Sequence, residues 1–322
     1  MRLYNRFQQH VEELEPIDRV YTASPPFFCI MSEKEQSLAY GGQALIEGVM
    51  MRSGGTMVMC VRQPDNEIAT DSIEINSITK RFKLLGLPFI RGIAMLFETM
   101  YYGIKSMMHS ANVALVEEEE EFTWSDYLLL IVMLLVINGL FIAIPFILTN
   151  YLGLEGIIFN IVESGIRLSL FAGYLWAISQ WGEVERVLQY HGAEHKAINA
   201  YEAGSDMSTE DVAKYSKLNL RCGTSFLFLT MIVSIALFAL VPKTTFILRL
   251  SYRLALIPVI AGASYEVLKL SDKYRDNALM QIIIKPGMAF QKLTTKEPTD
   301  DMIEVAVKAL KEVQNIQDAS AE

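Results

Sequence analysis

Four long apolar segments dominate the pattern of hydrophobic and polar positions along the chain. They cover residues 127–148, 156–181, 223–241 and 246–270. A helix needs about 20 mainly apolar residues to cross the hydrocarbon core of a bilayer, and each segment approaches or exceeds this length. The first and third segments contain no charged residue, whereas charges interrupt the other two, and Pro258 predicts a kink in the fourth. The pattern predicts four membrane-spanning helices.

The basic residues between these segments set the expected orientation, because cytoplasmic loops carry an excess of Lys and Arg. The loop at residues 182–222 and the tail after residue 270 are both rich in basic residues, whereas residues 149–155 contain none. Both termini and the loop 182–222 are therefore expected in the cytoplasm. The chain is expected to be a multi-pass protein of the cell membrane.

The regions that flank the apolar segments predict further elements. Residues 41–78 alternate short apolar runs with turns, which favours a small hairpin with strands at 57–61 and 73–75 and a turn at 64–66. Residues 89–115 have apolar positions at helical spacing, typical of a helix that lies at the membrane interface or packs on the bundle. Thr299 precedes an amphipathic tail helix that is expected to dock on the cytoplasmic part. Its apolar face is formed by Ile303, Val307, Leu310 and Val313.

These elements predict a mainly α-helical fold, in which a four-span helical membrane domain carries a small α/β cytoplasmic part. Residues 40–116 would form the hairpin region and amphipathic helix, 117–270 the membrane domain with its loop 182–222, and 271–322 the cytoplasmic tail. Residues 1–39 are expected to be an N-terminal extension, since Met31 opens a polar stretch that is typical of a natural start.

Composition narrows the functional classes. The chain has 322 residues, of which 52% are hydrophobic, and a formal net charge of −9. An acidic chain without a cluster of Lys and Arg argues against a nucleic-acid partner. The lipid bilayer and other membrane proteins are the expected partners. Cys29, Cys60 and Cys222 lie far apart and form no CxxC pair, so no disulfide framework is expected.

The strongest chemical motif is His191-Gly192-Ala193-Glu194-His195, which contains two of the four histidines of the chain. Residues four apart lie on one face of a helix, so both imidazoles can hold one metal ion. The H-x-x-E-H pattern is the inverted-zincin signature, in which Glu194 is the candidate catalytic base beside zinc or another divalent metal. The alternative interpretation is a pair of hydrogen-bonded structural histidines, since short motifs also occur by chance.

A metal site needs at least one further ligand from outside this motif. Cys222, which precedes the third apolar segment, offers a soft sulfur ligand. Glu47 and Glu266 offer carboxylates, although Glu266 lies within an expected span. A small buried thiol at a helix start explains Cys222 equally well.

A glycine-rich segment at residues 41–52 is a second candidate site. Glycines permit close backbone approach, and polar side chains between them can line a pocket. The alternative is a glycine-rich turn that leads into a strand, and residue chemistry weighs the two evenly. Neither a dinucleotide fingerprint nor a P-loop is present. The candidate residues are Gly41, Gly42, Gln43, Gly48 and Arg52, together with Glu47.

Ionisable residues inside two expected spans form a third candidate. Glu163 and Arg167 are four apart and can pair within one helix, while Arg249 and Arg253 reach a similar depth in the fourth span. Charges in a bilayer usually face a partner or a wet cavity. We expect an interhelical polar cluster. It either attracts a lipid phosphate or an anionic substrate, or it is a structural ion pair with arginines that reach to the interface.

Several longer motifs resemble the YqhQ-like family of bacterial membrane proteins, whose common domain has no established function. They are GGQALIEGVMMR (41–52), LGLPFIRG (85–92), YHGAEHKAINAYE (190–202), RCGTSF (221–226) and QKLTTKEP (291–298). Family members are labelled predicted metal-dependent enzymes. The resemblance therefore implies an integral membrane protein with a metal-dependent activity, and it supplies no substrate.

Two functions compete at this point. The leading hypothesis is a metal-dependent, hydrolase-like membrane enzyme that acts on a lipid-linked or peptide substrate at the cytoplasmic face. His191, His195 and either Cys222 or Glu47 would hold the metal, and Glu194 would be the general base. The competing hypothesis is a non-catalytic assembly factor or small transporter, whose function would rest on the Glu/Arg cluster.

Overall fold

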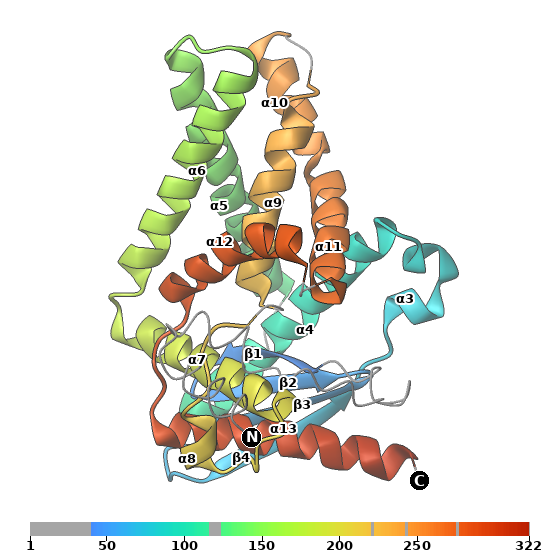
Figure 1. The fold of residues 1–322 in the computed structure, drawn as a ribbon, viewed down its shortest axis with the longest axis vertical. Coiled ribbons are helices and arrows are strands. Elements are labelled where there is room, and N and C mark those ends of the chain that lie inside the picture. The colour runs from blue at the N-terminus through green and yellow to red at the C-terminus, as the bar shows by residue number, and fades with distance from the viewer. Residues whose placement is uncertain (1–39, 116–123, 220–221, 242–243, 275–276, 322) are drawn as a thin grey trace, which may run out of the picture.

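A computed structural model describes residues 40–115, 124–219, 222–241, 244–274 and 277–321. Over this part of the chain the fold is mainly helical, with one small antiparallel sheet of four strands. Apolar helices gather at one end of the molecule, and the sheet with its covering helices forms the other end (Figure 1). This confirms the coarse part of the predicted architecture, a mainly α-helical chain with a small sheet.

The sheet consists of β1 (Tyr40–Leu45), β2 (Gly48–Ser53), β3 (Thr56–Arg62) and β4 (Ile68–Glu74), in sequential order. Two-residue turns join the first three strands, and Glu47 and Gly54 adopt the positive φ angles of 51° and 60° that favour such turns. The predicted strand at 57–61 lies within β3, the one at 73–75 overlaps the end of β4, and the predicted turn at 64–66 lies between them.

The glycine-rich segment at residues 41–52 forms the β1–β2 hairpin. The sequence predicted at most a turn that leads into one strand, so both β1 and its pairing with β2 were missed. In β2, Met50 and Met51 point into the cores on opposite faces of the sheet. A strand that is buried on both faces lacks the alternation of apolar and polar residues by which strands are usually recognised.

Helix α4 (Ile90–Leu115) covers one face of the sheet, where Tyr102 packs against a core that includes Leu45 and Met57. It matches the helix that the sequence predicts at 89–115. Two short elements precede it, α3 (Ile78–Arg81) and the 3-10 turn η1 (Lys83–Gly86).

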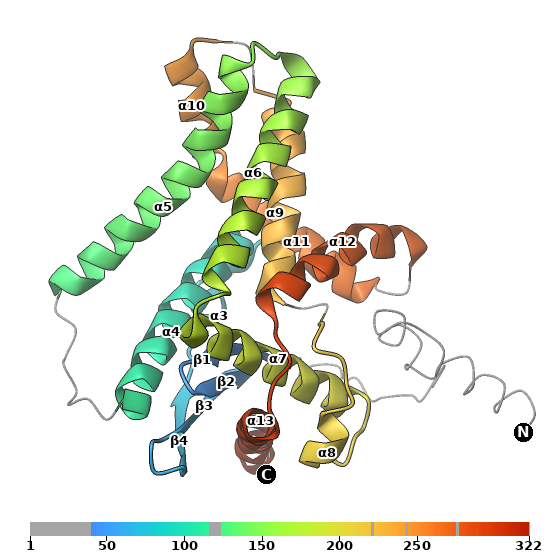
Figure 2. The ribbon, with the colours of Figure 1, turned by 90° about the vertical axis from the view of Figure 1, so that its left-hand side faces the viewer.

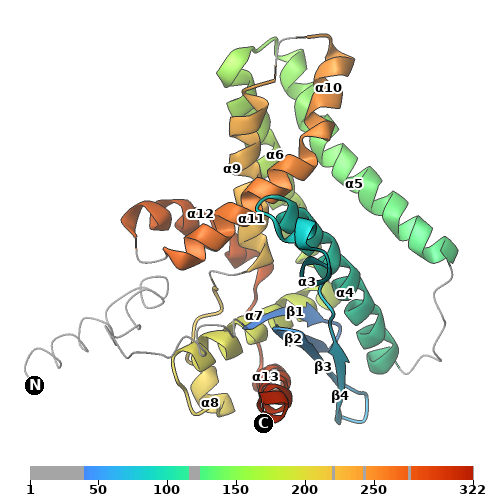
Figure 3. The same ribbon diagram turned by 90° about the vertical axis from the view of Figure 1, so that its right-hand side faces the viewer.

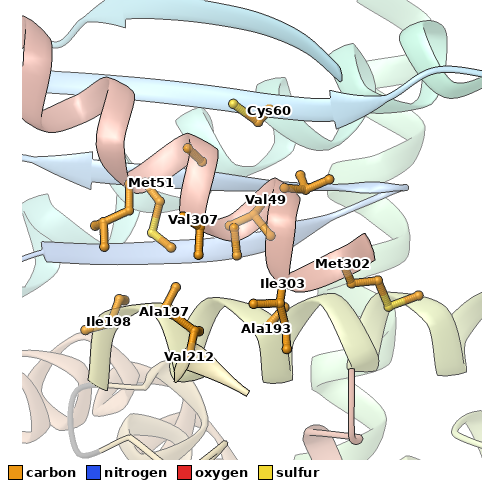
Figure 4. Close-up of a cluster of buried hydrophobic side chains, with 14 of the residues drawn as sticks. Val49, Met51, Cys60, Ala193, Ala197, Ile198, Val212, Met302, Ile303 and Val307 are labelled. Carbon is orange, nitrogen blue, oxygen red and sulfur yellow. The ribbon is translucent and has the colours of Figure 1, made fainter. Parts of the chain in front are cut away.

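The other face of the sheet packs against α7 (Gly182–Glu202) and α13 (Asp300–Ala321). Figure 4 shows Ala193 and Ala197 of α7 below the sheet residues Val49 and Met51, with side chains of α13 beside them. Val212 of the short helix α8 (Thr209–Val212) joins the same core. The predicted apolar face of the tail helix is confirmed, since its four residues are all buried: Ile303, Val307, Leu310 and Val313.

The apolar helices form the opposite end of the molecule (Figures 2 and 3). The predicted segments 127–148, 156–181 and 223–241 correspond to single helices, whereas 246–270 divides into two helices bent by 41°. The break falls at Leu256, just before Pro258, whose ring prevents a straight helix from continuing through it. The helices are α5 (Trp124–Tyr151), α6 (Gly156–Ile178), α9 (Gly223–Phe238), α10 (Phe246–Ala255) and α11 (Ile257–Lys273).

Among the described residues, α6 is the one helix long and apolar enough to cross a membrane by length and composition. A second candidate arises if α10 and α11 are taken as one bent span. The described apolar part of α5, Gly139–Tyr151, and all of α9 are shorter. The four spans, the domain limits and the cytoplasmic orientation therefore stay predictions, and the proposed extension at residues 1–39 lies outside the described residues.

Helix α12 (Ala278–Thr294), which contains Pro286, was not predicted from the sequence. It packs against α9 and α6. The chain then runs from its last residues past α7 to α13 (Figure 2). In this way α12 connects the apolar helices to the part that holds the sheet.

Candidate metal centre

Helix α7 carries His191, Glu194 and His195 near its middle, where Ala193 and Ala197 of the same helix pack into the core beside the sheet. Spacings of three and four residues place the polar side chains together on one face of the helix. His195 is 1% exposed and Glu194 is 4% exposed, so other parts of the chain cover this face. The covering elements include the start of α9 and the end of α12.

Cys222 enters the same space from the N-cap of α9. Its Sγ lies 3.3 Å from His191 Nε2, and the ring centroids of His191 and His195 are 4.4 Å apart. One possible ligand atom from each of these three residues lies within 4.8 Å of the others. The structure therefore brings together the two histidines of the motif and the cysteine that the sequence nominates as a third ligand.

Backbone carbonyls fix both imidazole rings. Nδ1 of His191 lies 2.7 Å from the carbonyl oxygen of Thr294, and Nδ1 of His195 lies 2.6 Å from that of Lys217. A carbonyl oxygen can only accept a hydrogen bond, so each Nδ1 carries a proton and donates it. In the neutral ring the lone pair is then on Nε2, which is the arrangement that metal-binding histidines commonly adopt.

Glu194 adds a carboxylate beside these donors. Its Oε2 lies 4.0 Å from His191 Nε2. The backbone N–H of Gly42 in β1 donates to this carboxylate. A Cβ at Gly42 would lie 2.9 Å from Glu194 Cδ and 2.7 Å from the Met50 carbonyl oxygen, so only glycine permits the approach. The glycine-rich segment thus reaches the site through its backbone.

The protonation of this cluster departs from ordinary behaviour. Burial raises the pKa of Glu194, against the opposing effect of both histidines. Burial alone would raise the pKa of Cys222, but His195 and His191 together bring it well below its ordinary value. Burial alone would lower the pKa of His191, but its hydrogen bond and charge interaction with Cys222 raise it to about 9. Without a bound cation, the pair therefore favours a thiolate and an imidazolium.

Further residues hold the site in place, and the sequence did not single them out. Thr224 Oγ1 lies 2.9 Å from Cys222 Sγ and 3.2 Å from Thr294 Oγ1, which links α9 to α12. The buried Gln291 amide donates to the Asn219 carbonyl at 2.7 Å and accepts from the Asn219 N–H at 3.0 Å. The signal that could have found Gln291 and Thr294 was the QKLTTKEP motif, which contains both residues.

Two candidate ligands lie elsewhere. Glu47, in the turn between β1 and β2, pairs with Arg186 at 2.5 Å and accepts a hydrogen bond from Tyr190. Glu266 of α11 forms an ion pair with Arg91. Neither carboxylate belongs to the group of donors that could share one ion among the described residues.

The other polar side chains of the glycine-rich segment connect the sheet to α4. Gln43 Nε2 donates to the Gly103 carbonyl at 3.3 Å, and Arg52 pairs with the buried Glu98 at 2.6 Å. Gly41 has no atom within 4 Å of the position of a Cβ, and Gly48 faces the backbone of β3. Of the candidate residues in this segment, the structure brings Gly42 to the site.

The ionisable residues of the apolar helices also come together. Glu163 of α6 binds Arg167 of the same helix at 2.6 Å and forms an ion pair with Arg253 of α10. The side chains of Glu163 and Arg253 are completely buried. Arg249 stacks over the ring of Phe159, with its guanidinium carbon 3.9 Å from the ring centroid. The cluster therefore has an interhelical ion pair at its centre, with Arg249 held by an aromatic ring.

The donor set at the histidine motif fits zinc. Zinc prefers imidazole nitrogen and thiolate sulfur, and catalytic zinc sites commonly have three protein ligands and one open position. His191, His195 and Cys222 supply three such donors. Glu194 lies beside them, where a carboxylate can act on a water molecule.

Comparison with known proteins places the chain in a family. A family model described as protein of unknown function (DUF1385) matches residues 87–316, more than half of the chain. The chain belongs to this family. Over 300 residues it is 35% identical to the uncharacterized protein YqhQ of Bacillus subtilis (strain 168), a match that covers 88% of this chain and 94% of that protein. The resemblance to the YqhQ-like family is thereby confirmed, and no solved structure matches the chain.

Proposed function

We propose that this protein is a metal-dependent, hydrolase-like membrane enzyme with its site at the cytoplasmic face of the membrane. The observation that carries the proposal is the arrangement of three donors. Two histidines place their Nδ1 protons on backbone carbonyls, and His191 directs Nε2 toward the Cys222 sulfur at 3.3 Å. A thiolate sulfur beside two imidazoles whose Nδ1 atoms are already bonded is a donor set that zinc prefers, and this supports the metal interpretation.

The residues around the donors support hydrolytic chemistry. A divalent cation at this position would act as a Lewis acid and activate water. Glu194 can accept the proton of that water on its carboxylate and pass it to a leaving group, because burial raises its pKa toward the working range of a general base. The N–H of Gly42 holds the carboxylate in position for this transfer.

The membrane part of the proposal rests on the apolar helices. Large apolar side chains along α5 and α6 remain exposed, which is unfavourable in water over so wide an area. They include Leu128, Leu129, Val136, Ile157, Ile158 and Ile161. A bilayer would cover them, with four spans formed by α5, α6, α9 and the bent pair of α10 and α11. Cys222 then lies at the cytoplasmic start of the third span, which suits a lipid-linked or a juxtamembrane peptide substrate.

Metal analysis tests the catalytic part. We expect the chain, purified without an affinity tag, to retain one zinc or similar divalent ion per molecule. Cys222→Ser and His195→Ala should lose it, while the controls Cys60→Ser and His109→Ala should keep it, because Cys60 and His109 lie outside the cluster. Glu194→Gln should also keep the metal, since Glu194 is proposed as a base.

A protein that folds normally yet contains no metal, with both ligand variants still functional, would refute the enzyme proposal. In that case the competing function gains weight, a non-catalytic assembly factor or small transporter. The observation in its favour is the completely buried ion pair between Glu163 and Arg253, together with Arg253 Nε, which is buried without a hydrogen-bond partner among the described residues. Loss of function in Glu163→Gln, with metal content unchanged, would support this alternative.

A further inference from the structure

The segment between the sheet and α4 exposes apolar side chains that nothing in the described part of the chain covers. Side chains of six apolar residues between 78 and 90 are exposed, and none of those described in this range is buried. Leu84 is the extreme case, with 74% of its surface exposed. The exposed apolar residues are Ile78, Phe82, Leu84, Leu87, Phe89 and Ile90.

Such a segment does not hold its own structure in water. Helix α3 and the turn η1 contain four residues each, and isolated helices this short are unstable without tertiary packing. In the part of the chain that the structure describes, their apolar side chains enter no core. An external apolar environment is therefore needed to stabilise them.

The charge of this region selects the kind of environment. Residues 75–97 contain no Asp or Glu, although the whole chain has a net charge of −9. The same stretch contains Lys80, Arg81, Lys83 and Arg91. Alternating basic and large apolar residues are typical of segments that lie in the plane of an anionic membrane surface. A second protein chain would not require this uniform sign of charge.

Contacts with α11 set the depth of the segment. The Phe89 carbonyl oxygen would lie 2.5 Å from a Cβ at Gly262, so the chain presses directly on this helix. Arg91 forms an ion pair with Glu266, which also accepts a hydrogen bond from the Phe89 N–H at 3.2 Å. Glu266 and Gly262 lie near the middle of α11, and precede its end at Lys273 by about 10 Å and 16 Å at 1.5 Å per residue. In the proposed topology this end of α11 faces the cytoplasm.

We propose that residues 78–91 form an interfacial anchor, which lies in the headgroup region of the cytoplasmic leaflet and binds the phosphates of anionic lipids. The apolar side chains enter the boundary of the acyl chains, and Arg81 and Lys83 face the lipid phosphates. This inference rests on the membrane part of the proposed function and is independent of the metal site.

The anchor also sets the position of the sheet. The N–H of Ile78, at its start, donates to Glu98 of α4 at 3.0 Å, and Glu98 binds Arg52 of β2. Farther along α4, the Ser110 hydroxyl accepts from the Ile46 N–H at 3.2 Å. The anchor, α4 and the β1–β2 hairpin are thus one connected unit, which orients Gly42 and the histidine site relative to the bilayer.

Tryptophan quenching by brominated lipids tests the anchor. In a full-length background with Trp124, Trp176 and Trp181 replaced by Phe, one new tryptophan is placed at Leu84→Trp. The protein is reconstituted in nanodiscs that contain anionic phospholipids brominated near the headgroup end of the acyl chains. We expect strong loss of emission at this position. Ile161→Trp on α6 is the membrane control, and Asn315→Trp on the exposed side of α13 is the aqueous control.

The controls separate failure of this inference from failure of the proposed function. Quenching at Ile161→Trp without quenching at Leu84→Trp would overturn the anchor while leaving the membrane proposal intact. No quenching at either position would overturn both. A blue-shifted but unquenched Leu84→Trp would show that protein, such as a second copy of this chain, covers the segment, and would also overturn the anchor.

A charge variant tests the lipid class. Arg81→Gln combined with Lys83→Gln should reduce quenching of Leu84→Trp by anionic brominated lipid, when this lipid is a minor component of a zwitterionic bilayer. The matched control is Lys105→Gln combined with Lys214→Gln, which removes two exposed positive charges outside residues 78–91. Equal quenching in the double variant and the control would refute binding of anionic lipid phosphates.

Discussion

The contact between the His191 imidazole and the Cys222 sulfur governs the chemistry of the site at the scale of single residues. Burial opposes charge on both groups, but the attraction between them prevails. It raises the pKa of His191 to about 9 and brings the pKa of Cys222 well below its ordinary value. Ligands must lose their protons before they coordinate a metal. A cation that binds here therefore competes with the proton that His191 retains at neutral pH.

We expect the affinity for zinc to increase with pH. Below the His191 pKa of about 9, each binding event displaces one proton. The apparent dissociation constant should fall by about tenfold per pH unit over roughly pH 6.5 to 8.5, and level off above the pKa of His191. Competition with a chromophoric chelator, corrected for the protonation of the chelator, measures this dependence. An affinity that does not change over this range would contradict the proton competition.

At the scale of elements, the site depends on the close approach between α7 and the segment that leaves α12. The Lys296 N–H donates to the Leu188 carbonyl of α7 at 2.9 Å. The Lys296 carbonyl lies against Gly192, where a Cβ would collide with it. The same segment includes Thr294, whose carbonyl fixes the His191 ring. Gly192 therefore sets how closely α7 and this segment can pack.

We expect Gly192→Ala to weaken metal binding without unfolding α7. The added methyl group would displace the segment at Lys296 and disturb the hydrogen bond from His191 to the Thr294 carbonyl. Loss of such an outer partner typically lowers metal affinity by about 10–100-fold. Isothermal titration with zinc measures the change. Gly182→Ala is the matched control. Gly182 lies at the start of the same helix, and a Cβ added there would have no described atom within 4 Å. Equal affinity in both variants would mean that the segment does not position His191.

At the scale of the whole molecule, the candidate centre lies where the sheet part meets the apolar helices. Helix α7 belongs to the sheet part, whereas Cys222 begins α9, and α12 connects the two (Figure 2). Donors from both parts are needed to complete the site. A change in how the two parts pack would therefore alter the candidate metal centre directly.

The ion pair between Glu163 and Arg253 joins α6 to α10 inside the apolar part, and a double-mutant cycle measures its strength. We expect Glu163→Ala to lower the free energy of unfolding by about 3–5 kcal/mol, because it leaves the buried charge of Arg253 unpaired. Arg253→Ala should lower it by less, because Glu163 keeps its ion pair with Arg167. The double variant should lower the free energy of unfolding by clearly less than the sum of the effects of the two single variants. Chemical unfolding in detergent provides the measurement, with Arg249→Ala as the control. Purely additive effects would show that the two side chains do not act as a pair.

Much of the fold could be predicted because its signals are local. The apolar face of α13 follows from residues such as Ile303, Val307 and Leu310, whose spacing alone defines one side of a helix. The break in the helix near Pro258 could be predicted because proline has no backbone N–H to donate within a helix. The β1–β2 hairpin was missed, because β2 is buried on both faces and Gly42 in β1 has no side chain to contribute to a pattern.

The same distinction between local signals and contacts of remote segments applies to the candidate site. The sequence by itself determined that His191, Glu194 and His195 share one helical face, because helical geometry depends only on spacing. Only the tertiary structure decided that Cys222 joins them while Glu47 pairs with Arg186. It also decided which carbonyls fix the two imidazoles. In the same way it decided that Gly42 lets β1 approach Glu194, and that Gly192 lets the segment at Lys296 approach α7. Backbone carbonyls are the same in every residue, so their role depends on the distance between remote segments and not on the residues that carry them.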